Sequence, residues 1–148
     1  IFDHYLMLNS DYYLENNKNN IPTGKLINVE GTYYDFRKFE RIGDFIQKKG
    51  SGFDENFIIR SKSKLVARLL SKKNKIELSL YSNQPGVQFY TGQHLKYHSK
   101  NKIIKKYQGL CLETQFYPNS PNNKKFPSTL ITPNNTYNHN MRFVIKEF

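Results

Sequence analysis

The sequence has very little cysteine, no tryptophan and no long hydrophobic run. Its single cysteine, Cys111, excludes an internal disulfide and fits a reducing compartment, so we expect a cytoplasmic protein. No apolar stretch approaches the length of a membrane span, and no signal-peptide pattern opens the chain. These absences exclude a small disulfide-stapled fold and predict no membrane partner.

Acidic residues are scarce: 12 Asp and Glu stand against 23 Lys and Arg, for a formal net charge of +11. This balance raises the question of nucleic-acid binding. The lysines, however, sit in short clusters beside Ser, Asn or Gly, as loop lysines do, and no recognised nucleic-acid motif is present. Solvated loops are therefore the better interpretation, and nucleic acid is not an expected partner. Weak, nonspecific binding to polyanions stays open.

The 148 residues are 37% hydrophobic and 15% aromatic. That composition is too apolar for a disordered chain, and the length suffices for one domain with its own core. No internal repeat or linker divides the sequence. The chain opens on Ile1 followed at once by strand-like sequence, so we expect this start to be a cut edge.

Alternation of apolar and polar residues, the period of a β-strand, dominates the sequence. It runs through residues 64–70, with Val66 and Ala67 on opposite faces, and through 75–82; the polar connector SKKNK between them predicts a hairpin. Single strands are also expected over 5–14, 56–60, 87–92 and 141–148, and one short helix over 39–49. Residues 16–24 are expected to form a loop. The predicted fold class is all-β, a sandwich of large antiparallel sheets.

One strand carries an unexpected charge. In GLCLETQFYPN, residues 109–119, alternation sends Leu110 and Leu112 to one face and Cys111 and Glu113 to the other. Placing a carboxylate among leucine side chains costs free energy of desolvation unless the charge is paired with a partner or serves a function. Cys111 is expected to be a small buried residue rather than a nucleophile.

An ordered set of motifs gives the sequence a family resemblance. The motifs, in order, are DHYLMLNSDYYL, IPTG, GTYYDFR, GFDENF, QPGVQFYTG, GLCLETQFYPNS and FPS. The series resembles the C-terminal half of the aldose 1-epimerase, or galactose mutarotase, family from Asp3 to about Pro133. The resemblance implies a galactose mutarotase-like β-sandwich, of which residues 1–148 would form the C-terminal portion as a single domain.

The same resemblance implies a reaction: interconversion of the α and β anomers of a free hexose, such as glucose or galactose. A base removes the proton of the anomeric hydroxyl and an acid protonates the ring oxygen, after which the opened sugar closes on its other face. No cofactor or metal is implied. A mutarotase-like protein that binds carbohydrate without turning it over stays open as the alternative.

Three residues match family positions. Glu113, in LETQ, matches the general base; Asp54, in GFDENF, and Gln88, in PGVQFY, match side chains that contact the sugar. Taken singly, Glu113 would be a glutamate on a solvated face, Asp54 a turn residue and Gln88 a strand amide satisfied by a neighbour. The ordered motifs favour the functional roles, and the face carrying Glu113 is then expected to line a cleft where its carboxylate is partly desolvated.

The sequence also departs from the family pattern. The family's acid histidine lies in an NHxYFNL-like segment upstream, absent from residues 1–148, so a complementary N-terminal segment is an expected partner. Glu55 stands where the family usually has His, and is expected to add a carboxylate beside the sugar contact. The spacing of His94 and His98 would suit zinc only on a helix, so both, like His139, are expected to be surface histidines.

Overall fold

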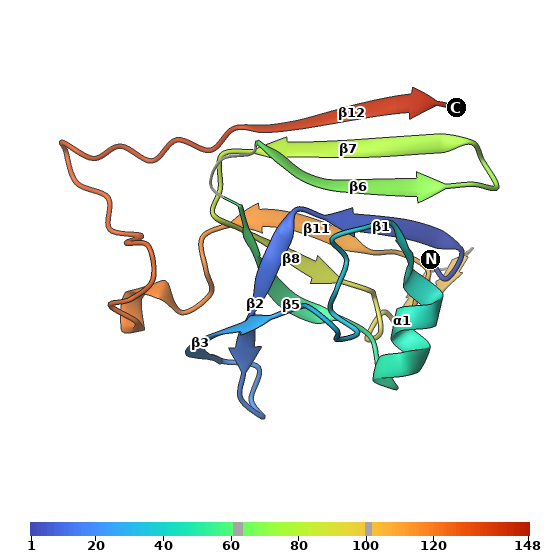
Figure 1. Ribbon diagram of the computed structural model, residues 1–148, viewed down its shortest axis with the longest axis horizontal. Helices are drawn as coiled ribbons and strands as arrows, with labels where there is room; N and C mark the ends of the chain where they lie inside the picture. The colour runs from blue at the N-terminus through green and yellow to red at the C-terminus, as the bar shows by residue number, and fades with distance from the viewer. Residues whose placement is uncertain (61–63, 100–101) are drawn as a thin grey trace.

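The computed structural model describes residues 1–60, 64–99 and 102–148, with the side chains of 98, 99 and 102 outside the description. It confirms the all-β prediction: two five-stranded antiparallel sheets pack face to face, beside a two-stranded ribbon (Figure 1). The first sheet contains, in order, β12 (Met141–Glu147), β7 (Ile76–Ser82), β6 (Leu65–Ser71), β1 (His4–Leu8) and β4 (Glu40–Arg41). The second contains β11 (Cys111–Gln115), β8 (Gly86–Tyr90), β5 (Asp54–Ile59), β2 (Ser10–Asn16) and β3 (Pro22–Asn28). The ribbon pairs β9 (Tyr97–Ser99) with β10 (Lys102–Ile104).

The predicted hairpin and helix are both present. Strands β6 and β7 pair antiparallel around the connector at 72–75. The helix, α1, spans Ile42–Lys49 and buries Ile42, Phe45 and Ile46. It ends at Gly50, whose left-handed backbone (φ 76°) lets its N–H bond the carbonyls of Ile46 and Gln47.

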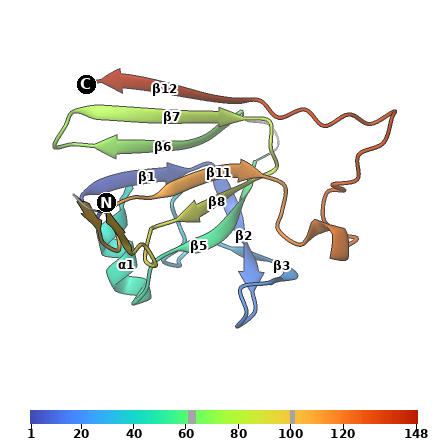
Figure 2. The same ribbon diagram turned by 180° about the vertical axis from the view of Figure 1, so that it is seen from behind.

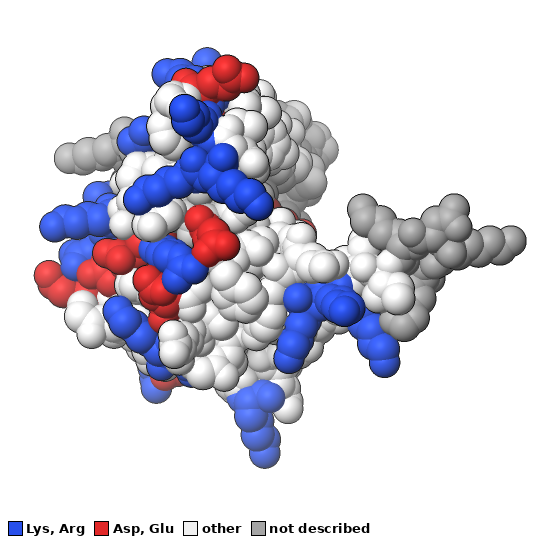
Figure 3. Space-filling model, turned by 90° about the vertical axis from the view of Figure 1, so that its right-hand side faces the viewer, with Lys and Arg blue, Asp and Glu red and all other residues white. Residues whose placement is uncertain are grey.

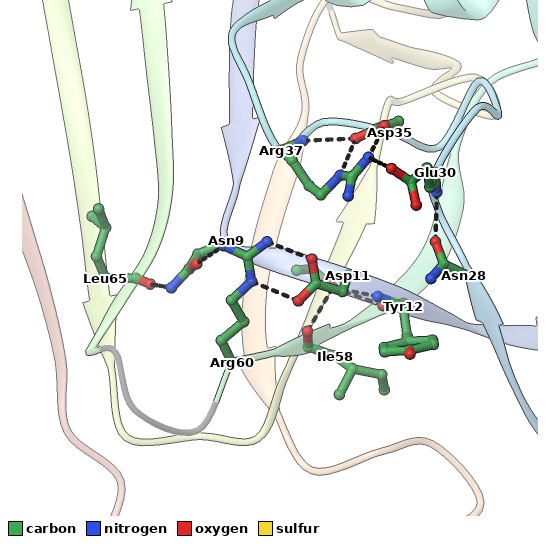
Figure 4. Close-up of polar contacts among 11 residues, drawn as sticks. Asn9, Asp11, Tyr12, Asn28, Glu30, Asp35, Arg37, Ile58, Arg60 and Leu65 are labelled. Carbon is green, nitrogen blue, oxygen red and sulfur yellow. Dashed lines mark hydrogen bonds and ion pairs between the residues drawn. The ribbon is translucent and has the colours of Figure 1, made fainter.

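The run of residues 5–14 does not form the single strand that its pattern predicts. The chain passes from the first sheet to the second at Asn9, which separates β1 from β2. Asn9 donates its side-chain amide to the Leu65 carbonyl (2.9 Å), and Arg60 holds the Asp11 carboxylate with its guanidinium (Figure 4). Asn9, Ser10 and Asp11 interrupt the hydrophobic alternation here, and these contacts with distant residues mark the crossing.

Two further expectations are wrong in detail. The loop predicted for 16–24 is shorter, because β3 already begins at Pro22; as the first residue of an edge strand, proline loses no ladder hydrogen bond there. In β6, the register against β7 shifts between Leu65 and Ala67. This bulge turns both Val66 and Ala67 into the core, where each is 0% exposed, instead of onto opposite faces.

The core lies between the two sheets and is rich in phenylalanine. The rings of Phe53 and Phe89 stack with centroids 5.4 Å apart, and Phe36 meets both edge-on. All three, with Phe57, are at most 1% exposed. Phe57 and Phe89 lie on the inner faces of β5 and β8, Phe53 directly precedes β5, and Phe36 comes from the segment between β3 and β4. The core therefore fixes the two strands whose other face carries Asp54 and Gln88.

The surface charges are dispersed. On the face drawn in Figure 3, Lys and Arg are spread over several regions, and Asp and Glu lie among them on one side. Four arginines in the described part of the chain are engaged in ion pairs with carboxylates of the protein itself: Arg37, Arg41, Arg60 and Arg68. Guanidinium groups already paired within the fold are poor candidates for a phosphate-binding fork.

The segment between β11 and β12 makes a long excursion. It leaves the body of the molecule, passes through the short 3-10 helix η1 (Ser120–Asn122), and returns to place β12 beside β7 (Figure 2). Thr114 Oγ1 and His139 Nε2, 2.9 Å apart, join its two ends. No helix among the described residues is both long and apolar enough to cross a membrane.

Candidate active site

Strands β11, β8 and β5 are neighbours, and their register brings the three predicted site residues together. Glu113 lies directly opposite Gln88, and Gln88 lies directly opposite Asn56. Asp54 is two residues before Asn56 on β5, so its side chain points to the same face. Residues separated by 59 positions in the sequence therefore share one surface, the outer face of the second sheet.

Asp54 and Gln88 are in direct contact. Gln88 Nε2 donates a hydrogen bond to Asp54 Oδ1 at 2.9 Å. Asp54 is thus the first residue of a strand with a cross-strand side-chain partner, not a residue of an isolated turn. Gln88 Oε1 is buried and has no hydrogen-bond partner among the described residues. The contact leaves Asp54 Oδ2 as an acceptor that a ligand could engage.

Glu113 lies on β11, at the edge of the sheet, and is exposed. The expectation of a partly desolvated carboxylate inside a cleft is therefore wrong for the described chain, because an edge strand is flanked on one side only. Cys111, on the same face, senses both carboxylates: partial desolvation raises the pKa of its thiol, and the Glu113 and Asp54 carboxylates raise it further.

Cys111 is exposed, which corrects the expectation that it is buried. It lies opposite Tyr90 on the outer face of the sheet, while its neighbour Leu112 packs toward the core. The raised pKa keeps this thiol protonated near neutrality, and the thiolate is the nucleophilic form of cysteine. The expectation that Cys111 is no nucleophile agrees with this environment.

Glu55 does not add a free carboxylate beside Asp54, as the sequence suggested. Alternation along β5 turns it away, and it forms an ion pair with Lys49 (Nζ to Oε1, 2.7 Å) in which the two side chains are only 13% and 11% exposed. Tyr34 donates its hydroxyl to the same Glu55 oxygen at 3.2 Å. A hollow of about 380 Å3 opens at this end of β5, with Asp54, Glu55 and His94 on its wall.

Asn56 belongs to the site face but was not predicted. It is 2% exposed, and neither atom of its side-chain amide has a hydrogen-bond partner among the described residues. Its Oδ1 lies over Gly86, where an added Cβ would approach it to 2.6 Å. The spacing of two from Asp54 within a strand is a signal in the sequence that could have placed Asn56 in this row.

Comparison with known proteins identifies the family. The family model described as aldose 1-epimerase matches residues 1–144. The chain belongs to the aldose 1-epimerase family. It is 40% identical over 149 residues to galactose mutarotase from Mus musculus, and 34% identical over 136 residues to aldose 1-epimerase from Escherichia coli (strain K12). These alignments cover 97% and 84% of this chain but 44% and 39% of the relatives, so the chain spans less than half the length of the curated relatives it matches.

A solved structure supports the same assignment. An aldose epimerase homologue from C. elegans superimposes with a TM-score of 0.89 at 25% identity, covering 99% of this chain and 46% of that one. The resemblance stated from the motifs is therefore confirmed, as is the mutarotase-like β-sandwich. The coverage is consistent with a partial chain corresponding to the C-terminal half of the family fold.

The histidines of this aldose 1-epimerase chain lie outside β5, β8 and β11, although His94 lines the same hollow as Asp54. His94 is exposed, its backbone N–H donates to the Tyr90 hydroxyl (3.1 Å), and its ring stacks on Tyr90 with centroids 6.5 Å apart. His98 belongs to β9, not to a helix, and its side chain lies outside the described residues. His139 is exposed and contacts Thr114. The described residues contain no cluster of three potential metal ligands among His, Cys, Asp and Glu.

Proposed function

We propose that the protein containing this chain interconverts the α and β anomers of a free hexose, glucose or galactose, without a cofactor. The observation that carries the proposal is the register of β11, β8 and β5, which gathers Glu113, Gln88 and Asp54 on one face. Two relatives bear the names galactose mutarotase and aldose 1-epimerase, which agree with this chemistry.

In the proposed reaction, Glu113 is the general base. Its carboxylate takes the proton of the anomeric hydroxyl while an acid protonates the ring oxygen. The bond between the anomeric carbon and the ring oxygen breaks, its electron pair passes to the ring oxygen, and an aldehyde forms. After rotation of the aldehyde end, the ring closes on the opposite face and both protons return. The exposure of Glu113 leaves it accessible to a sugar.

Asp54 and Gln88 are proposed to bind the sugar. Hydroxyl groups of a hexose both donate and accept hydrogen bonds, so a carboxylate beside an amide suits a pair of neighbouring hydroxyls. The hydrogen bond from Gln88 Nε2 fixes Asp54 Oδ1, and Oδ2 remains the acceptor for a sugar hydroxyl. Since the carboxylate is ionised, such a bond is stronger than a neutral one.

We also propose that residues 1–148 form a single domain completed by an N-terminal segment, which supplies the acid. The chain spans 44% of the length of the mouse relative. Large apolar side chains lie exposed on β12 and on the segment before it: Leu130, Ile131, Tyr137, Phe143 and Ile145, each at least 49% exposed. A surface of this kind is typical of a protein contact.

We propose a cytoplasmic location for the protein. The single cysteine, Cys111, is unpaired, which supports a reducing compartment.

The decisive experiment is the substitution Glu113→Gln in the protein expressed from its full coding sequence. Loss of a general base is expected to lower kcat roughly 10²–10⁴-fold. Because Gln keeps the size of Glu and leaves Asp54 and Gln88 in place, sugar affinity should change little. Mutarotation of freshly dissolved α-glucose, followed by polarimetry, measures the rate, and Glu147→Gln on β12 is the matched control. Full activity in Glu113→Gln would exclude the assigned role.

A non-catalytic carbohydrate-binding protein is the second candidate. The exposure of Glu113 favours it, because a solvent-exposed carboxylate is less well matched to proton transfer than an enclosed one. Calorimetry with galactose distinguishes the two functions. Binding without any acceleration of mutarotation supports the second candidate, and binding with acceleration supports the first.

A further inference from the structure

The ion pair between Lys49 and Glu55 is the most enclosed charge pair found among the described residues. Lys49 extends from the last turn of α1 and donates to Glu55 Oε1 (2.7 Å) and to the Gly52 carbonyl (2.6 Å). Its ammonium lies over the rings of Phe53 and Tyr34, at 4.8 and 5.4 Å from their centroids. Desolvated charges persist only with such complete coordination, so the geometry of this pair is tightly constrained.

The second oxygen of Glu55 holds the backbone of Asp54. Glu55 Oε2 accepts the Asp54 N–H at 2.7 Å. The pairing of β5 with β2 extends only from residue 57 to residue 59, so β2 does not reach Asp54. The Glu55 carboxylate therefore bonds the amide that lies beyond the end of the neighbouring strand.

The residue before Asp54 is held from the other side. Phe53 donates its N–H to Thr91 Oγ1 (2.7 Å), and its carbonyl accepts the Thr91 N–H (3.0 Å). Together with the Lys49 bond to Gly52, these contacts fix three consecutive residues of the entry into β5. The side chain of Asp54 then points to the outer face, where Gln88 meets it.

We propose that the Lys49–Glu55 ion pair positions Asp54 for sugar binding; the inference rests on the proposed role of Asp54. Lys49 and Glu55 are positioning residues, because they act on the Asp54 backbone from the opposite face of the strand. A side chain displaced by about 1 Å loses much of the strength of its hydrogen bonds to a substrate, and such losses reach roughly 10²-fold in kcat/KM. Because the pair carries no net charge, it acts on the site by fixing the position of Asp54 and not by adding charge.

The test removes both charges together, because Lys49→Met alone would leave a buried carboxylate unpaired and could unfold the protein. Replacing a buried pair by apolar residues of similar size often leaves stability unchanged, so the double variant Lys49→Met, Glu55→Met should fold. Urea unfolding followed by circular dichroism verifies this. The matched control is Arg68→Met, Glu77→Met, which removes an ion pair between β6 and β7 in the other sheet.

Two measurements on the protein from its full coding sequence test the proposal. Amide hydrogen exchange at Asp54 should be at least about tenfold faster in the Lys49–Glu55 double variant, because its acceptor is gone. The KM for galactose should rise about tenfold while kcat stays within about threefold, since the loss falls on binding and not on Glu113. The single variant Lys49→Arg, with Glu55 in place, keeps the positive charge and its hydrogen-bond donors and should retain most of the affinity. The control variant Arg68→Met, Glu77→Met should leave KM unchanged.

A double-mutant cycle assigns the effect to Asp54. In an Asp54→Asn background, removing the Lys49–Glu55 pair should raise KM no further, because the carboxylate that it positions is already absent. An undiminished rise in that background overturns the inference, and so does an unchanged Asp54 amide or an unchanged KM in the folded double variant. If the double variant fails to fold, Lys49→Ala, Glu55→Ala replaces it, since alanine also removes the acceptor for the Asp54 N–H, and there too an unchanged KM overturns the inference.

Failure of the proposed function has a different signature. A wild-type protein that neither binds nor converts sugar would refute that function. Amide exchange would still report whether the Lys49–Glu55 pair holds Asp54, and an unaltered exchange rate would overturn the inference by itself.

Discussion

Substituting Gln88→Glu would replace the hydrogen bond to Asp54 by a repulsion between two carboxylates. The amide and the carboxylate have nearly the same shape, so the change is almost purely electrostatic. The Gln88 nitrogen and Asp54 Oδ1 are 2.9 Å apart, and Glu113 lies opposite position 88 on the same face, adding a second negative charge. We expect the variant to be destabilised more at high pH than at low pH.

The magnitude follows from the distance. Two unit charges about 3 Å apart repel by about 6 kcal/mol at an effective dielectric constant of about 20. Both side chains are half-buried, so solvent screening reduces this to about 3 kcal/mol. At pH 5 the pair escapes the repulsion by keeping one proton, which costs only about 1 kcal/mol relative to an ordinary glutamate pKa near 4.3.

The sign of the pH dependence is fixed by linkage. Repulsion raises the pKa of the carboxylate pair in the folded variant above its value in the unfolded chain. As pH rises, the unfolded chain releases this proton first, so the variant loses stability through the window between the unfolded and the raised pKa. The destabilisation should therefore grow from about 1 kcal/mol at pH 5 to about 3 kcal/mol at pH 8.

Urea unfolding at the two pH values, followed by circular dichroism because the chain has no tryptophan, measures the effect. Gln88→Met is the control, since it also removes the hydrogen bond but adds no charge. In an Asp54→Asn background most of the penalty should vanish. Equal stability of the Glu and Met variants at pH 8 would mean that Asp54 and position 88 do not meet in solution, and the proposed sugar contact would fail with them.

Two further predictions concern the whole fold. The 148-residue chain alone is expected to be inactive and poorly soluble, because its apolar surface is uncovered; polarimetry with and without an added N-terminal segment checks this, and activity of the chain alone would contradict it. Burial lowers the pKa of His4 below its ordinary value, so stability is lost as pH falls through the unfolded pKa near 6.5. His4→Gln should therefore shrink the fall in unfolding free energy between pH 7.5 and pH 5 in urea titrations, and an identical fall would show that His4 contributes nothing to it.

Local sequence determined much of the architecture. The strict alternation around Leu112 and Glu113 predicted which side chains face the core, because a strand has a period of two residues whatever it pairs with. The helix and the hairpin of β6 and β7 were predictable for the same reason: their signals are contained within a short segment. The ordered motifs also sufficed to predict the family, because they extend along most of the chain and do not depend on any single strand or helix.

Tertiary structure decided what depends on distant partners. Asn9 marks the crossing between sheets because of its contact with Leu65, and the bulge at Val66 and Ala67 exists only against the register of β7. The pairing of Glu55 with Lys49, in place of a role beside Asp54, depends on where α1 ends, and the exposure of Cys111 depends on β11 being an edge strand. Alternation gives each side chain a face, but the strand or helix that packs against that face is chosen by the fold, so burial and pairing stay beyond the reach of a local pattern.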